Sequence, residues 1–157
     1  MEVHHDGDLP ARSGLGSSSA FTVGLLNAVM ALQGKQALNQ DLAKQAIHVE
    51  QNIINEIVGS QDQVASAYGG INIIKFETDG TFDVSPVILS SDKMASLQNH
   101  LMLFYTAIKR DASEILKVQS KNTANNHKIL SQMKNQVNVI KKILHSGGNL
   151  NKFGQVL

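Results

Sequence analysis

The sequence contains no cysteine and no tryptophan, and only two of its 157 residues are proline. The absence of cysteine excludes disulfide bonds and zinc sites built on thiolates, and it fits a reducing compartment. No apolar stretch approaches the ~20 residues that a membrane-spanning helix needs. Because only 4% of the residues are aromatic, any buried core must be mostly aliphatic. We therefore expect a cytoplasmic protein that has no membrane partner.

Charge is also scarce and nearly balanced. Charged residues make up 17% of the chain, the formal net charge is +1, and hydrophobic residues make up 42%. This composition is typical of a folded globular chain and argues against a disordered one. Without a long basic run, it also argues against a nucleic-acid partner. The length allows one large core or two small ones.

Helical spacing of apolar residues predicts helices in the first half of the chain. One follows the segment at residues 10–20 and ends at Gly34, and a second has Asn39 as its N-cap and continues through Ile54. A short helical turn is predicted over residues 63–68, ended by Gly69 and Gly70.

The second half mixes strands and helices, so that the fold class is α+β. Residues 71–77 and 82–88 flank an Asp79-Gly80 turn and predict a β-hairpin. The apolar run 101–105 predicts a buried strand. Helices are predicted from a Ser90 cap through Leu97, over residues 111–121 and over residues 126–145, with a boundary between two folding units near residues 90–99. The apolar stripe from Leu130 to Leu144 favours core packing over a coiled coil, which needs several sustained heptads.

A glycine- and serine-rich segment precedes the first helix at residues 10–20. Gly14 and Gly16 allow positive φ and a close approach of the backbone to a ligand, and we expect the serines to cap the helix. The first N–H groups of a helix lack internal partners, and the helix dipole favours an anion there. The segment lacks the Gly-Lys-Ser/Thr ending of a Walker A loop. It predicts a phosphate site, with a plain capped helix as the alternative.

Carboxylates that suit phosphoryl transfer follow this segment. Asp62 lies in an irregular stretch, where it can act as a base toward an acceptor hydroxyl or can simply cap a turn. Ser17 or Ser18 and Glu50 offer hard oxygen ligands for Mg²⁺, which uses few protein groups.

Other polar residues give weaker indications. Arg12 and Arg110 match phosphate oxygens in geometry, although solvated surface arginines are more frequent. The cluster of His4, His5, Asp6 and Asp8 does not predict a metal site, because adjacent residues of an extended segment point to opposite faces.

The segment Pro10 to Ala20 resembles the second motif of the GHMP kinases, roughly Pro-x-x-x-Gly-Leu-Gly-Ser-Ser-x-Ala. Glu50 and the segment 59–63, which resembles the family's Gly-x-x-Asp-Gln/Asn, follow at the expected distance. Within the family, the sequences of four segments are similar to those of heptose 7-phosphate kinases: residues 8–19, 61–63, 68–70 and 106–110.

The resemblance implies an ATP-dependent kinase that phosphorylates a sugar phosphate, with the anomeric hydroxyl of a heptose 7-phosphate as the expected acceptor. It implies that Asp62 is catalytic, that Ser18 and Glu50 hold Mg²⁺, and that Thr106 and Arg110 contact the substrate. The ATP-binding residues implied by the motif are Arg12, Ser13, Gly14, Leu15, Gly16, Ser17, Ser18 and Ser19.

The resemblance also implies a partial two-domain fold. Residues 1–91 would belong to an N-terminal ATP-binding domain like domain 2 of ribosomal protein S5, and residues 92–157 would begin a ferredoxin-like C-terminal domain. The family's first and third motifs are not found here, so we expect a fragment. Apolar surface left by a severed sheet would favour self-association, including a homodimer.

Three functional hypotheses follow from these observations. The first is the sugar phosphate kinase, with galactokinase-like or mevalonate-kinase-like acceptors as alternatives. The second is a nucleotide- or anion-binding module that transfers no phosphate. The third is a helical interaction protein that uses the stripe from Leu130 to Leu144.

Overall fold

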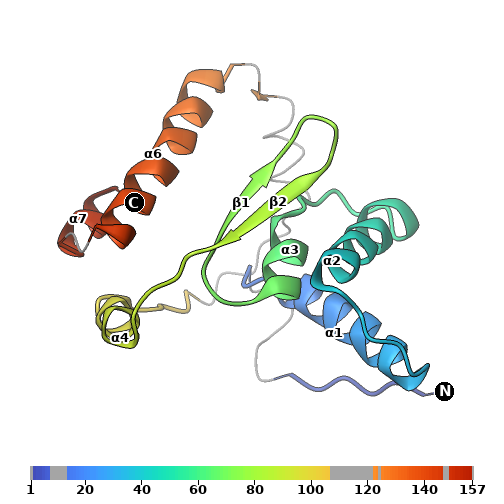
Figure 1. The fold of residues 1–157 in the computed structure, drawn as a ribbon. Helices are drawn as coiled ribbons and strands as arrows, with labels where there is room; N and C mark the ends of the chain where they lie inside the picture. The colour runs from blue at the N-terminus through green and yellow to red at the C-terminus, as the bar shows by residue number, and fades with distance from the viewer. Residues whose placement is uncertain (1, 8–13, 107–121, 124, 147–148, 157) are drawn as a thin grey trace. The chain divides into compact units, whose positions relative to one another are not determined.

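The computed structural model describes residues 2–7, 14–106, 122–123, 125–146 and 149–156. These residues form helices and one two-stranded antiparallel sheet, so that the α+β class is confirmed (Figure 1). The elements in chain order are α1 (Ser17–Leu32), α2 (Asn39–His48), the π-helix η1 (Val49–Ile53), α3 (Gln61–Tyr68), β1 (Asn72–Phe76), β2 (Phe82–Pro86), α4 (Ser91–Asn99), α6 (His127–His145) and α7 (Asn151–Val156).

The described residues fall into two compact units. The first holds the residues up to Gly70 together with Thr106, and the second holds Ile71–Tyr105 with the described residues from 122 onward. A compact unit is defined by contacts alone, so the division into family domains at residue 91 stays a prediction, as do the S5-like and ferredoxin-like subfolds.

The first unit packs α1, α2 and α3 against one another (Figure 1). The predicted first helix is confirmed, and Gly34 follows it with φ of +71°. Ala43 and Ala46 on α2 and Val64 on α3 have no exposed surface. Small buried side chains let helices approach closely, and here they bring the first turns of α1 and α3 near the end of α2.

The second predicted helix differs from the expectation in two respects. Its N-cap is Leu38, and Asn39 is its first residue, without a side-chain cap. After His48 the helix widens into η1, where the Ile54 N–H donates to the Val49 carbonyl at 2.9 Å, five residues back. Asn55, with φ of +59°, then ends it. Apolar spacing does not distinguish this wider turn from an α-helix.

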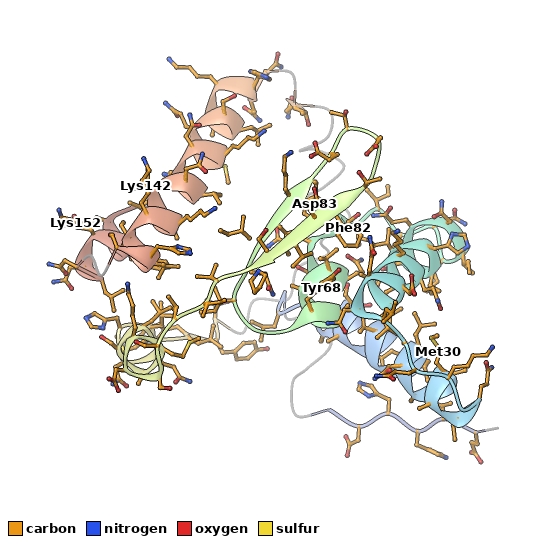
Figure 2. All side chains as sticks on the ribbon, viewed as in Figure 1. Met30, Tyr68, Phe82, Asp83, Lys142 and Lys152 are labelled. Carbon is orange, nitrogen blue, oxygen red and sulfur yellow. The ribbon has the colours of Figure 1, made fainter. Side chains whose placement is uncertain are left out.

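The second unit contains the predicted hairpin. In the β1–β2 register Asn72 pairs with Pro86 and Phe76 with Phe82, and Gly80 takes φ of +84° in the connecting loop. Phe82 is buried whereas Asp83 is exposed, as expected for neighbours on one strand (Figure 2).

An apolar cluster stabilises this unit. Val87, Leu97 and Leu144 are buried in it, and partly buried side chains pack around them: Ile71, Ile73, Leu89, Ile140, Leu150 and Phe153. Ser90 caps α4 as predicted, since its Oγ accepts a hydrogen bond from the Lys93 N–H at 3.3 Å.

The helix α6 confirms the prediction for residues 126–145, but its stripe is only partly core. Leu144 is buried, whereas Met133 and Val137 are 57% and 47% exposed. The Gln136 side-chain amide donates to the Val156 carbonyl and links α6 to α7, which carry Lys142 and Lys152 (Figure 2). Apolar spacing alone does not say which part of a stripe finds a partner.

The prediction of a buried strand at residues 101–105 is wrong. All five side chains are exposed, from 53% at Leu101 to 83% at Leu103, and the segment has no regular structure. An apolar run becomes a buried strand only where another strand accepts its backbone hydrogen bonds. The expectation of self-association rests on this kind of surface.

The predicted helix at residues 111–121 lies outside the described residues. Among the helices that the structure describes, none is long and apolar enough to cross a bilayer.

Candidate functional site

The glycine- and serine-rich loop leads directly into α1. Gly16 is the N-cap, with φ of +71° and ψ of 16°, and its carbonyl accepts the first helical hydrogen bond from the Ala20 N–H at 3.0 Å. Gly14 also takes a positive φ, of +74°. Both conformations are left-handed and favour glycine.

The expectation that serines cap this helix is wrong. Its N-cap is a glycine, and the structure shows no side-chain cap. Among the described residues, no side-chain oxygen accepts a hydrogen bond from the first N–H groups of α1, and the helix dipole makes this end partly positive. An anion fits such an end better than it fits a capped one.

Asp62 lies beside this loop. It is exposed in the first turn of α3, and a Cβ atom built on Gly16 would lie 3.4 Å from its Oδ2. The predicted phosphate loop and the predicted base are therefore neighbours in space, although 45 residues lie between Gly16 and Asp62 in the sequence. The close packing of α1 against α3 produces this arrangement.

Beneath the loop, Glu50 forms a buried polar cluster with Ser19 and Gln63. The Ser19 hydroxyl donates to Glu50 Oε2 at 3.0 Å, and the Gln63 amide nitrogen Nε2 donates to the same oxygen at 2.5 Å. Glu50 and Gln63 are each 1% exposed, and Ser19 is 5% exposed. The cluster joins the first turns of α1 and α3 to the π-helix η1.

One oxygen of the Glu50 carboxylate lacks a partner among the described residues. Within this part of the chain Glu50 Oε1 and Gln63 Oε1 are both buried without a hydrogen bond, and no cationic side chain lies within 4.0 Å of Glu50. A buried acceptor left unpaired is costly. A carboxylate oxygen in this state is the hard donor that Mg²⁺ prefers, so the residues present fit that ion.

The structure places Glu50 in contact with Ser19, the neighbour of Ser18. Ser18 itself is exposed, and its carbonyl accepts a hydrogen bond from the Thr22 hydroxyl at 3.1 Å. The role of Ser18 as an ion ligand stays a prediction.

Gln51 holds the segment that leads into α3. Its amide donates to the Val58 carbonyl at 3.0 Å and to the Ser60 hydroxyl at 3.1 Å. Sequence reasoning missed Gln51 and Ser19 as supporting residues and read Gln63 only as part of a motif. For Gln63 the sequence signal was a polar side chain next to the apolar Val64 in a predicted helical turn, where a buried amide must find partners. Gln51, between Glu50 and Asn52, carries no such signal.

The remaining predicted residues are not assembled at this site. Arg12, Ser13 and Arg110 lie outside the described residues, and Thr106 is grouped with the first unit. His5 contacts the Phe21 ring, with ring centroids 4.5 Å apart. Among the described residues, no three side chains of the His, Cys, Asp or Glu type come together as they would around a metal ion.

A groove also runs along α1, but it is separate from this cluster. Ala20, Asn27, Lys35 and Ser66 are among the residues that line it. None of the predicted site residues that the structure describes belongs to its lining.

Comparison with known families gives a match over the first compact unit. Residues 1–70 match the family described as GHMP kinases N terminal domain. Over 115 residues the chain is 30% identical to D-glycero-alpha-D-manno-heptose 7-phosphate kinase of Campylobacter jejuni, covering 73% of this chain and 34% of that relative.

Two solved structures are also similar. A D-glycero-D-manno-heptose 1-phosphate kinase from Bacteriodes thetaiotaomicron is 30% identical with a TM-score of 0.55, covering 57% of this chain and 29% of that one. A putative sugar kinase from Campylobacter jejuni is 26% identical with a TM-score of 0.58, covering 81% and 39%. This chain thus spans 29% to 39% of the length of these relatives. The resemblance to the GHMP kinases, and among them to heptose phosphate kinases, is confirmed.

Proposed function

We propose that this chain carries the phosphate loop and the catalytic aspartate of a GHMP-type kinase, which transfers the γ-phosphate of ATP to a hydroxyl of a sugar phosphate. The observation that carries the proposal is the position of the Asp62 carboxylate beside Gly16, at the uncapped start of α1. A loop that binds phosphate and a carboxylate beside it are two of the parts that catalyse phosphoryl transfer to a hydroxyl. We also propose that the protein is cytoplasmic.

The loop would bind the ATP phosphates through its backbone. Residues 14–18 would supply N–H groups that no side chain of the described residues caps, and the positive φ of Gly14 and Gly16 would turn the chain around the phosphates. Arg12 and Ser13 would extend this contact on the N-terminal side.

Asp62 would take the proton of the acceptor hydroxyl as the acceptor oxygen bonds to the γ-phosphorus of ATP. In the same transfer the bond from the γ-phosphorus to the bridging oxygen of ADP breaks, and ADP leaves. The exposure of Asp62 in the first turn of α3 leaves the carboxylate open to an acceptor. Ser18 and Glu50 would hold Mg²⁺, which would neutralise phosphate charge when it is bound with ATP.

The acceptor class rests on the relatives. One relative is named for a heptose 7-phosphate and another for a heptose 1-phosphate. Both acceptors are heptose phosphates, and heptose 7-phosphate is the one we propose first, with Thr106 and Arg110 as substrate contacts.

The test is ADP formation that depends on the acceptor. We expect the protein to release ADP from Mg-ATP in the presence of D-glycero-D-manno-heptose 7-phosphate. Asp62→Asn should lower kcat by about 100- to 10,000-fold, the range of a lost general base, with ATP affinity retained. Asp41→Asn is the matched control, because Asp41 is also an exposed aspartate in the first turn of a helix, here α2.

The alternatives appear as distinct outcomes of this assay. ATP binding without ADP release from any acceptor would support a nucleotide-binding module. ADP release with galactose or mevalonate alone would support another branch of the family. Equal activity of Asp62→Asn and Asp41→Asn would contradict the role of Asp62.

A further inference from the structure

The Glu50 carboxylate is held from one side only. Its hydrogen bonds from Ser19 and Gln63 both end on Oε2, whereas Oε1 receives none from the residues that the structure describes. We propose that Gln63 is a positioning residue: its amide fixes the Glu50 carboxylate so that Oε1 stays available to a divalent cation. This inference rests on the proposed function.

The orientation of the Gln63 amide follows from its partner. Oε2 of Glu50 can only accept when the carboxylate is ionised, so the group that faces it at 2.5 Å must be a donor. The opposite amide orientation would set the Gln63 oxygen against a carboxylate oxygen. The donor Nε2 is therefore the atom that gives this residue its role, and a side chain of similar size without it cannot replace it.

Gln63 also connects the two halves of the site. It follows Asp62 in the first turn of α3, and consecutive residues of a helix point about 100° apart, since one turn holds 3.6 residues. Asp62 accordingly lies beside Gly16 while Gln63 reaches Glu50. A change in the placement of α3 would shift both carboxylates together.

Ser19 completes the link from the side of the loop. Its hydroxyl reaches the same Glu50 oxygen from the first turn of α1, the helix whose start would bind phosphate. Hydrogen-bond partners that orient a metal ligand typically change metal affinity about 10- to 100-fold when they are removed. The cluster therefore gives Gln63 a measurable effect on a bound ion that it does not itself contact.

The experiment compares Mn²⁺-dependent ATP affinity in four proteins, with Mn²⁺ as a probe for Mg²⁺. Gln63→Met removes the donor and keeps the side-chain length. The double variant Glu50→Gln with Gln63→Glu keeps an amide–carboxylate pair but moves the charge onto α3. Gln45→Met, an exposed amide on α2, is the matched control beside the unchanged protein.

We expect Gln63→Met to weaken ATP binding in the presence of Mn²⁺ by about 10- to 100-fold while metal-free ATP binds as before. The double variant should regain the thermal midpoint of the unchanged protein but not its Mn²⁺-dependent affinity. Gln45→Met should match the unchanged protein in both measurements.

Several results would overturn the inference. If folded Gln63→Met binds ATP in the presence of Mn²⁺ as tightly as the unchanged protein does, Gln63 is not a positioning residue. The proposed function is not affected by that result. If the double variant regains the affinity for ATP in the presence of Mn²⁺, the pair has a structural role alone. This measurement decides the question if Gln63→Met does not fold. If Mn²⁺ does not strengthen ATP binding even in the unchanged protein, the proposed function fails and the inference fails with it.

Discussion

The two compact units bury different kinds of side chain. Near the start of α1, the first unit buries Ser19, Glu50 and Gln63, and two of their oxygens have no hydrogen bond to any described residue. The second unit closes on Val87, Leu97 and Leu144, an apolar cluster that needs no polar partner. Apolar burial stabilises a fold directly, whereas buried unpaired oxygens oppose folding.

This difference separates the site from its surroundings. A polar cluster that costs stability and adjoins an uncapped helix start is expected where a ligand completes the missing interactions. The apolar cluster of the second unit is expected to affect stability and not chemistry.

The largest effect on stability is expected in the second unit. Leu144→Ala removes a side chain that is 4% exposed, and we expect it to lower the free energy of unfolding by about 2 to 5 kcal/mol. Met133→Ala is the matched control on the same helix, where the side chain is 57% exposed and the change should be small. Chemical denaturation measures both, and equal losses would contradict the assignment of Leu144 to the core.

A smaller and equal effect is expected at two left-handed glycines, one in each unit. Gly16 has φ of +71° and Gly80 has φ of +84°. A side chain in this region costs about 1 to 2 kcal/mol, so Gly16→Ala and Gly80→Ala should each lower stability by about that amount. Thermal denaturation measures this loss, and an unchanged midpoint in either variant would contradict the left-handed geometry at that residue.

The smallest effect concerns pH and the hairpin loop. The Thr81 hydroxyl and N–H donate to Asp79 Oδ1 at 2.6 and 2.9 Å, and these bonds, the hydroxyl foremost, lower the pKa of Asp79. A lowered pKa in the folded state adds stability above the unfolded pKa, and this stability is lost as pH falls through the folded value. Thr81→Val should raise the Asp79 pKa toward its ordinary value, as NMR titration of its carboxyl group would show. An unchanged pKa would mean that the hydroxyl is not the cause.

Local patterns predicted most of the elements. The helix before Gly34, the hairpin around Asp79 and Gly80 and the Ser90 cap depend on neighbouring residues and were confirmed. A strand at residues 101–105 would need a distant partner, and apolar spacing does not distinguish the widened turn of η1 from an α-helix. Such features are set by tertiary contacts that no local pattern contains.

The candidate site was predicted in its parts but not in its connections. Motif resemblance singled out the loop, Glu50 and Asp62, and the structure brings Asp62 beside Gly16. The motif resemblance did not indicate that Ser19 and Gln63 would share one oxygen of Glu50. Hydrogen bonds between three separate helices follow from their packing, which periodicity does not specify.

The most direct test of the central claim is calorimetric titration of Mg-ATP into the unchanged protein, Gly16→Ala and Gly80→Ala. Both variants introduce the same strain, but only the first places a methyl group in the loop, beside Asp62. We expect saturable binding by the unchanged protein and by Gly80→Ala, and a loss of affinity of about tenfold or more, equivalent to about 1.4 kcal/mol, in Gly16→Ala. Absence of saturable binding by the folded protein, or equal affinity in the two variants, would contradict a phosphate site at the start of α1.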